Sequence, residues 1–111
     1  MIIYKICRET DWEQACAAGI YDGSPDDKRD GFIHFSLKNQ VDKTLEKHFT
    51  GQEGLILLAI DTACLKSEKL KYEASKTGEK YPHLYGSLCP STVQSRHMIV
   101  KNEAGKNEVY F

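Results

Sequence analysis

Two short segments combine histidine with aromatic and hydroxyl side chains, and they are the best candidates for chemistry in this sequence. Residues 31–36 are G-F-I-H-F-S and residues 81–86 are Y-P-H-L-Y-G. Histidine changes charge near neutral pH, so it can transfer a proton or bind a ligand through directed hydrogen bonds. Neighbouring aromatic rings can stack on a planar ligand, and hydroxyl groups can bond to its polar atoms. We therefore expect these two segments to form the functional surface.

The first segment has the alternation of a β-strand. This pattern places Phe32, His34 and Ser36 on one face, with Ile33 and Phe35 on the other. On that face, His34 and Ser36 can hydrogen-bond a ligand near the end of the strand, while Phe32 can stack on it. A structural histidine bonded to the backbone is the alternative interpretation.

The second segment places a histidine between two tyrosines on a restrained backbone. Pro82 fixes one backbone dihedral, and Gly86 permits close approach or an unusual conformation. On a loop, His83 with Tyr81 and Tyr85 suits a recognition element, and tyrosines packed over a sheet edge would give the same composition.

Glu73 precedes the second segment and is the candidate carboxylate. The alternation of residues 69–74 predicts a half-exposed strand in which Glu73 faces away from Tyr72 and Ala74, the expected core residues. A carboxylate close to two histidines can stabilise an oxocarbenium-like transition state or orient a hydroxyl group. An exposed glutamate among lysines is the alternative.

The sequence lacks the patterns of other common functional sites. The four histidines have no metal-binding spacing, so no metal site is predicted. No G-x-S-x-G, G-x-G-x-x-G or Walker sequence is present. The four cysteines are scattered without a C-x-x-C pair, which favours reduced thiols in a cytoplasmic protein.

The surrounding pattern predicts the elements that position these residues. A capping box at Thr10–Glu13 predicts a helix that ends at Gly19. Residues 20–30 are expected to form an exposed loop, and Ser36 is expected to cap a helix over 37–49. Residues 61–67 suit a turn or short helix. Strands are predicted over residues 2–8, 31–36, 55–60, 69–74, 93–100 and 108–111, and the run 55–60 is apolar enough for a central strand.

Length and composition indicate a single domain spanning residues 1–111. The chain is 41% hydrophobic and 28% charged, with a net charge of -1, so a nucleic-acid partner is not expected. Its longest apolar run is too short to cross a bilayer, and its first residues lack the pattern of a secretory signal. We expect an α+β fold in which two or three helices pack on a mixed β-sheet.

The combined motifs resemble the domain-of-unknown-function 952 family over residues 2–100. The matching features are G-F-I-H-F-S, P-H-L-Y-G, Trp12 and the pair Tyr72-Glu73. The resemblance implies a split sheet similar to the ADP-ribosyltransferase fold, whose cleft holds NAD in the enzymes. On that analogy the matching positions are Tyr4 and Lys5 on the first strand, His34 with Ser36, and Glu73.

The resemblance implies an NAD-using transferase or glycohydrolase. In this hypothesis His34 and Ser36 hold the ribose, Tyr85 or Tyr4 stacks on nicotinamide, and Glu73 or His83 stabilises the developing positive charge. The alternatives are a non-catalytic module that binds a nucleotide or another small ligand, and a protein-interaction domain.

Overall fold

The apolar run at residues 55–60 forms the centre of the larger of two β-sheets. The computed structural model describes residues 1–111. In it, β3 (Leu55–Asp61) lies between β1 (Ile2–Arg8) and β6 (Val93–Lys101), with β7 (Asn107–Tyr110) at the edge. All residues from Leu55 to Ile60 are buried, which confirms the predicted central strand covered on both faces.

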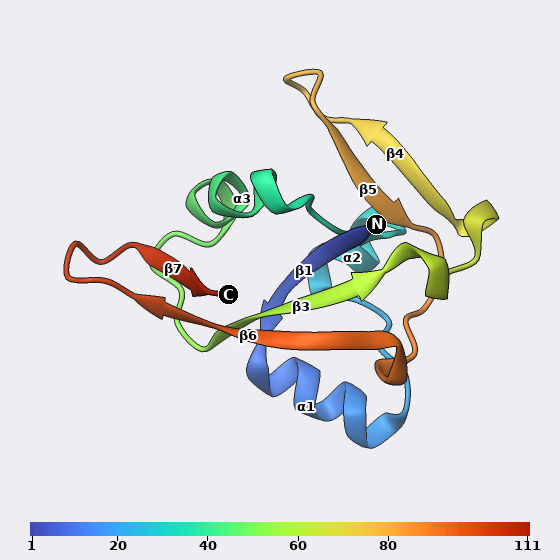
Figure 1. Cartoon of the computed structure of the whole chain (residues 1–111), viewed down its shortest axis with the longest axis horizontal. Coiled ribbons are helices and arrows are strands. Elements are labelled where there is room, and N and C mark those ends of the chain that lie inside the picture. The colour runs from blue at the N-terminus through green and yellow to red at the C-terminus, as the bar shows by residue number, and fades with distance from the viewer.

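Hydrophobic side chains cover both faces of this sheet. On one face, Trp12 and Ala15 of α1 (Glu9–Ala18) pack in a cluster with Leu58. On the other, Val41 and Leu45 of α3 (Val41–His48) pack in a second cluster. Figure 1 shows α1 and α3 on different sides of the sheet. The sheet is thus held between two apolar layers.

A smaller sheet carries both histidine segments. Its strand order is β2 (Ile33–His34), β5 (Lys80–Leu84) and β4 (Leu70–Ala74). Figure 1 shows the β4–β5 hairpin extending away from the larger sheet. Backbone hydrogen bonds between Tyr4 and Ser36, 2.8 Å in each direction, join the two sheets.

The α+β class is confirmed, but the expectation of a mixed sheet is wrong. Every strand pair in both sheets is antiparallel. The reason is visible in the register, where Arg8 at the end of β1 pairs with Leu55 at the start of β3. The long connection between them leaves and re-enters the sheet at the same end, so the strands run in opposite directions.

The predicted exposed loop over residues 20–30 contains a short helix. This helix, α2 (Pro25–Asp30), starts with a capping box in which the Asp27 N–H donates to Ser24 Oγ (3.2 Å) and the Ser24 N–H donates to Asp27 Oδ2 (2.8 Å). Gly31 ends it with a φ of 87°, which glycine adopts without strain. Because α2 has no apolar residue, hydrophobic periodicity gives no sign of it.

The other two helices also differ at their boundaries. The first begins at Glu9 with Arg8 as its N-cap and no side-chain cap, so the predicted Thr10–Glu13 capping box is wrong. Its predicted end at Gly19 is confirmed. The helix predicted over 37–49 is a 3-10 turn (Lys38–Gln40) followed by α3. Three further 3-10 turns span Thr62–Cys64, Ser67–Lys69 and Pro90–Thr92.

Two expectations about the smaller sheet are corrected. Residues 81–84, expected in a loop, lie in the central strand β5, where Pro82 is buried. In β4 the predicted core residues Tyr72 and Ala74 are exposed, whereas Glu73 is half-buried. Because β4 is an edge strand with no fully buried face, alternation of polar and apolar residues could not fix its orientation.

All four cysteines are free. Burial raises the pKa of Cys7 to about 12, so this thiol stays protonated at neutral pH. None of the helices has the length and hydrophobicity needed to cross a membrane.

The core makes a direct prediction about stability. Leu58→Ala removes a fully buried side chain from β3 and should lower the free energy of unfolding by about 2–5 kcal/mol. Met98→Ala on the neighbouring strand is the control, since Met98 is 65% exposed and its loss should change stability by less than about 0.5 kcal/mol. Urea denaturation followed by circular dichroism measures both, and equal effects would contradict the assigned core.

Candidate functional site

A buried carboxylate, that of Asp27 on α2, organises the first histidine segment. Lys5 Nζ of β1 donates to Asp27 Oδ2 at 2.7 Å, and the Asp27 and Lys5 side chains are only 1% and 5% exposed. The His34 backbone N–H donates to Asp27 Oδ1 at 3.1 Å, and His34 Nδ1 donates to the same oxygen at 2.6 Å. Asp27 thus links α2 to β1 and β2.

The environment of Asp27 keeps it ionised. Burial disfavours the charged carboxylate, but the hydrogen bond from His34 and the charge and hydrogen bond of Lys5 outweigh burial. The pKa of Asp27 therefore lies well below its usual value. At neutral pH the group is a carboxylate that accepts hydrogen bonds and donates none.

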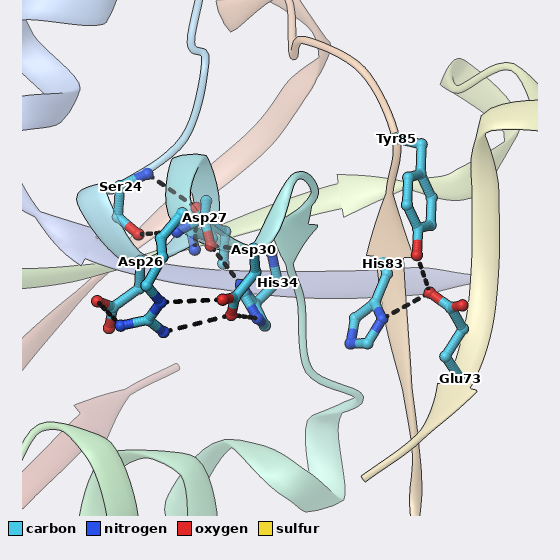
Figure 2. Close-up of polar contacts among 10 residues, drawn as sticks. Ser24, Asp26, Asp27, Asp30, His34, Glu73, His83 and Tyr85 are labelled. Atoms are coloured by element: carbon cyan, nitrogen blue, oxygen red, sulfur yellow. Dashed lines mark hydrogen bonds and ion pairs between the residues drawn. The ribbon is translucent and has the colours of Figure 1, made fainter.

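His34 is held between two carboxylates. Its Nδ1 faces Asp27, and its Nε2 lies 3.1 Å from Oδ2 of Asp30 at the end of α2 (Figure 2). The Arg29 guanidinium, followed by His34, lowers the pKa of Asp30, so this group is also ionised. Since carboxylates only accept hydrogen bonds, each contact needs a proton on the nitrogen that faces the carboxylate. The Nδ1 contact is a hydrogen bond, and the Nε2 contact is an ion pair when the ring is protonated.

His83 has a different arrangement. Its Nδ1 lies 2.9 Å from Oε1 of Glu73, and the Tyr85 hydroxyl donates to the same oxygen at 2.5 Å. These bonds, the one from Tyr85 first, lower the pKa of Glu73. Because the ionised carboxylate only accepts, Nδ1 must donate in this bond, and a neutral His83 ring then has its lone pair on Nε2. The Phe32 ring stacks on His83 with centroids 4.0 Å apart and planes at 16°.

The two histidines converge on one cavity. They are direct partners in the β2–β5 register, and their ring centroids are 5.4 Å apart. Both line a cavity of about 490 Å³. In Figure 2 Glu73 and Tyr85 lie on the far side of His83 from His34. The histidine segments, 49 positions apart in sequence, therefore form one site.

The remaining candidates fall into two groups. Ser36 and Lys5 line the cavity, but Lys5 is fully engaged with Asp27, and Ser36 Oγ lies 3.1 Å from Thr44 Oγ1. Tyr4 lies in the core on the α3 side of the larger sheet, packed edge-on against Phe111, and does not line the cavity.

Phe32, Glu73 and Tyr85 likewise do not line the cavity. They contact the His83 ring or each other, so in this structure they orient His83. The geometry gives Glu73 the role of holding a histidine, whereas the sequence hypothesis placed it against the reacting centre.

Sequence reasoning missed Asp27 and Asp30, the two aspartates of α2 that contact His34. The Ser24-Pro25 pair followed by Asp27 was the available signal, because serine at the N-cap, proline at the first position and an acidic residue at the third mark a helix start. Asp30 then lies four residues before His34, at the helix end. His48, the last residue of α3, also lines the cavity. No group of three or more His, Cys, Asp or Glu side chains is arranged to hold a metal ion.

Comparison with protein families places this arrangement in a known group. A family model described as "Protein of unknown function (DUF952)" matches residues 6–96. The chain belongs to this family. No curated protein matches the sequence.

Solved structures of a similar protein have the same fold. The crystal structure of protein CC0527 from Caulobacter crescentus has 40% sequence identity and a TM-score of 0.91, covering 97% of this chain and 94% of that one. The solution NMR structure of CC0527 has 41% identity and a TM-score of 0.84, covering 95% and 90%. These similarities support the two-sheet architecture of this DUF952 domain.

The buried ion pair predicts that substitutions of two neighbouring aspartates differ strongly in their effect on stability. Asp27→Asn leaves Lys5 as a buried, unpaired cation and should lower the free energy of unfolding by about 3–5 kcal/mol. Asp26→Asn is the matched control, since that side chain is 74% exposed and its change should cost less than about 1 kcal/mol. Chemical denaturation at pH 7 measures both variants, and similar small losses would contradict the structural role of Asp27.

The same carboxylate predicts a dependence of stability on pH. Because the pKa of Asp27 is lower in the folded than in the unfolded chain, its contribution is complete above the unfolded value of about 3.9. It is lost as the pH falls through the folded value. The free energy of unfolding should therefore decline below about pH 4, and less steeply in Asp27→Asn. Denaturation between pH 2 and pH 7 measures the slopes, and equal slopes would refute this assignment.

Proposed function

We propose that this DUF952 domain binds a small polar ligand in the cavity and that His34 and His83 act on it as proton donor and proton acceptor. One observation carries the proposal. Two imidazoles on the wall of one cavity each have Nδ1 against a carboxylate, and only His34 has a second carboxylate at Nε2.

His83 is the proposed general base. Glu73 holds the proton on Nδ1, so Nε2 can accept one from a hydroxyl group or water in the cavity. A carboxylate behind the imidazole also stabilises the cation that forms after proton uptake. The stacked Phe32 ring limits rotation of His83.

His34 is the proposed donor. Its Nε2 contacts Asp30, whose side chain is 33% exposed and lies on the wall of the cavity. A ligand oxygen that displaces Asp30 would accept a hydrogen bond from Nε2 without any movement of the ring, which Asp27 holds from the other side. His34 would then stabilise negative charge on the ligand.

The size and lining of the cavity suit a ligand with hydroxyl groups. Its volume of about 490 Å³ is within the usual range for small-molecule sites. Ser36, Thr44 and Tyr81 place three hydroxyl groups on its wall. These groups both donate and accept hydrogen bonds, as recognition of a sugar such as ribose requires.

NAD is the ligand to test first, on the resemblance of the family's fold to ADP-ribosyltransferases. In the proposed reaction the bond between nicotinamide and ribose breaks, and nicotinamide leaves with the electron pair. The oxygen of water or of an acceptor hydroxyl bonds to the ribose carbon, and its proton passes to His83. A non-catalytic module that binds a nucleotide in the same cavity is the alternative.

The test measures nicotinamide release and NAD binding together. In His83→Gln, nicotinamide release should fall by about 10²–10⁴-fold, because a general base is lost, while binding changes less. His34→Gln should weaken both. His97→Gln is the control, since His97 lies on β6, bonds to Ser95 and does not line the cavity.

These measurements distinguish a catalytic domain from a non-catalytic binding module. Binding that requires His34 and His83 without any release would establish the non-catalytic module and reject the reaction. Wild-type release that persists in both cavity variants would reject the histidine roles.

A further inference from the structure

The cavity wall has an excess of positive charge that the rest of the chain lacks. The whole chain carries a net charge of -1. Four basic side chains line the cavity: Lys5, Arg29, Lys47 and Lys76. Only three acidic ones do: Asp26, Asp27 and Asp30. The excess exists before any charge on histidine is counted.

The three aspartates are all engaged by other cavity residues. Asp27 binds Lys5 and His34, while Asp26 and Asp30 both bind Arg29. Lys47 and Lys76 form no ion pair. The lysines that do are Lys5, Lys43 and Lys101. Two cations at this cavity therefore have no acidic partner in the protein.

Lys47 and Lys76 come from separate elements that the fold brings to one cavity. Lys47 lies in the last turn of α3, and Lys76 lies in the connection between β4 and β5. An ion pair from Lys43 to Glu79 (2.8 Å) links this connection to α3. The carboxyl end of a helix offers no free N–H groups, so an anion there must be bound by side chains.

The side chains beside the two lysines add hydrogen-bonding groups. His48 and Ser75 are their immediate neighbours and also line the cavity. Burial and the charge of Lys47 lower the pKa of His48, so at neutral pH its ring is mainly neutral and can donate one N–H. A hydroxyl and an imidazole donor that line the same cavity as two ammonium groups suit an oxyanion with several acceptor oxygens.

We infer that the cavity is built for a phosphorylated small molecule, whose phosphoryl group binds between Lys47 and Lys76 while its reacting part lies at His34 and His83. This inference rests on the proposed function, because it assigns the ligand class of the same site. Two ammonium groups match the charge of a phosphate ester near neutral pH, which is close to -2. Lysine binds phosphate as a point charge and does not require the planar geometry that arginine provides for carboxylates.

Inorganic pyrophosphate is the probe, because it contains the phosphoryl group without sugar or base. Titration of the full chain, followed by amide NMR, should give saturable shifts at residues 47, 48, 75 and 76. Lys47→Gln and Lys76→Gln should each weaken binding by about threefold, and the double variant by about tenfold, given the strength of exposed ion pairs. Added salt should weaken binding to the wild type more than to the double variant.

Lys66→Gln is the matched control. Lys66 is also exposed and forms no ion pair, but it lies outside this cavity. Its loss should leave pyrophosphate binding unchanged. Equal weakening by Lys66→Gln and Lys47→Gln would mean general attraction to a lysine-rich surface and would overturn the inference, as would the absence of saturable shifts.

The experiment separates this inference from the proposed function. Pyrophosphate binding that depends on Lys47 and Lys76 but is unaffected by added NAD, in a protein without nicotinamide release, would retain the phosphoryl subsite and reject NAD as the ligand. A single-stranded RNA that binds at the same lysines far more tightly than pyrophosphate would reject the small-molecule assignment.

Discussion

The buried carboxylate of Asp27 is the interaction on which the geometry of the site depends. An isolated charge in this position would be strongly unfavourable, so its partners must be in place when the chain folds. Those partners are Lys5 on β1, the His34 ring and backbone in β2, and the Ser24 amide before α2. Satisfying one charge therefore fixes the position of α2 against both sheets and the orientation of His34. The contacts of Asp27 thus determine where the residues of the site lie.

A second constraint, the register of β2 with β5, brings His83 to His34. In an antiparallel pair, directly opposed residues project to the same face, so pairing these two positions places both rings on one side of the smaller sheet. The backbone bonds between Tyr4 and Ser36 then hold that sheet against β1. Residues of both sheets line the cavity, which lies near this junction.

The sequence predicted the parts of the fold that depend on apolar pattern. Residues 55–60 were apolar enough to be predicted as a central strand, and Gly19 fitted the end of the first helix. It did not predict α2, whose stability comes from a cap and a buried charge rather than from an apolar face. It also misassigned the faces of β4, because an edge strand exposed on both sides imposes no inside and outside. For the site, residue types identified His34 and His83, but their shared cavity is a tertiary property. Lys47, His48 and Lys76 gave no local signal, since their relation depends on how α3 meets the β4–β5 connection.

The division of charge around the cavity also explains why the two histidines are not interchangeable. Both nitrogens of His34 face carboxylates, so neither is free to accept a proton from a ligand. His83 is held at one nitrogen only, which leaves the other available to the cavity. Asp27 and Asp30 contact His34, and Arg29 pairs with Asp30, whereas Lys47 and Lys76 have no acidic partners. An anionic group on a ligand would pair with Lys47 and Lys76, and an acceptor oxygen on it would bind His34. His83 would then face the part of the ligand from which a proton is removed.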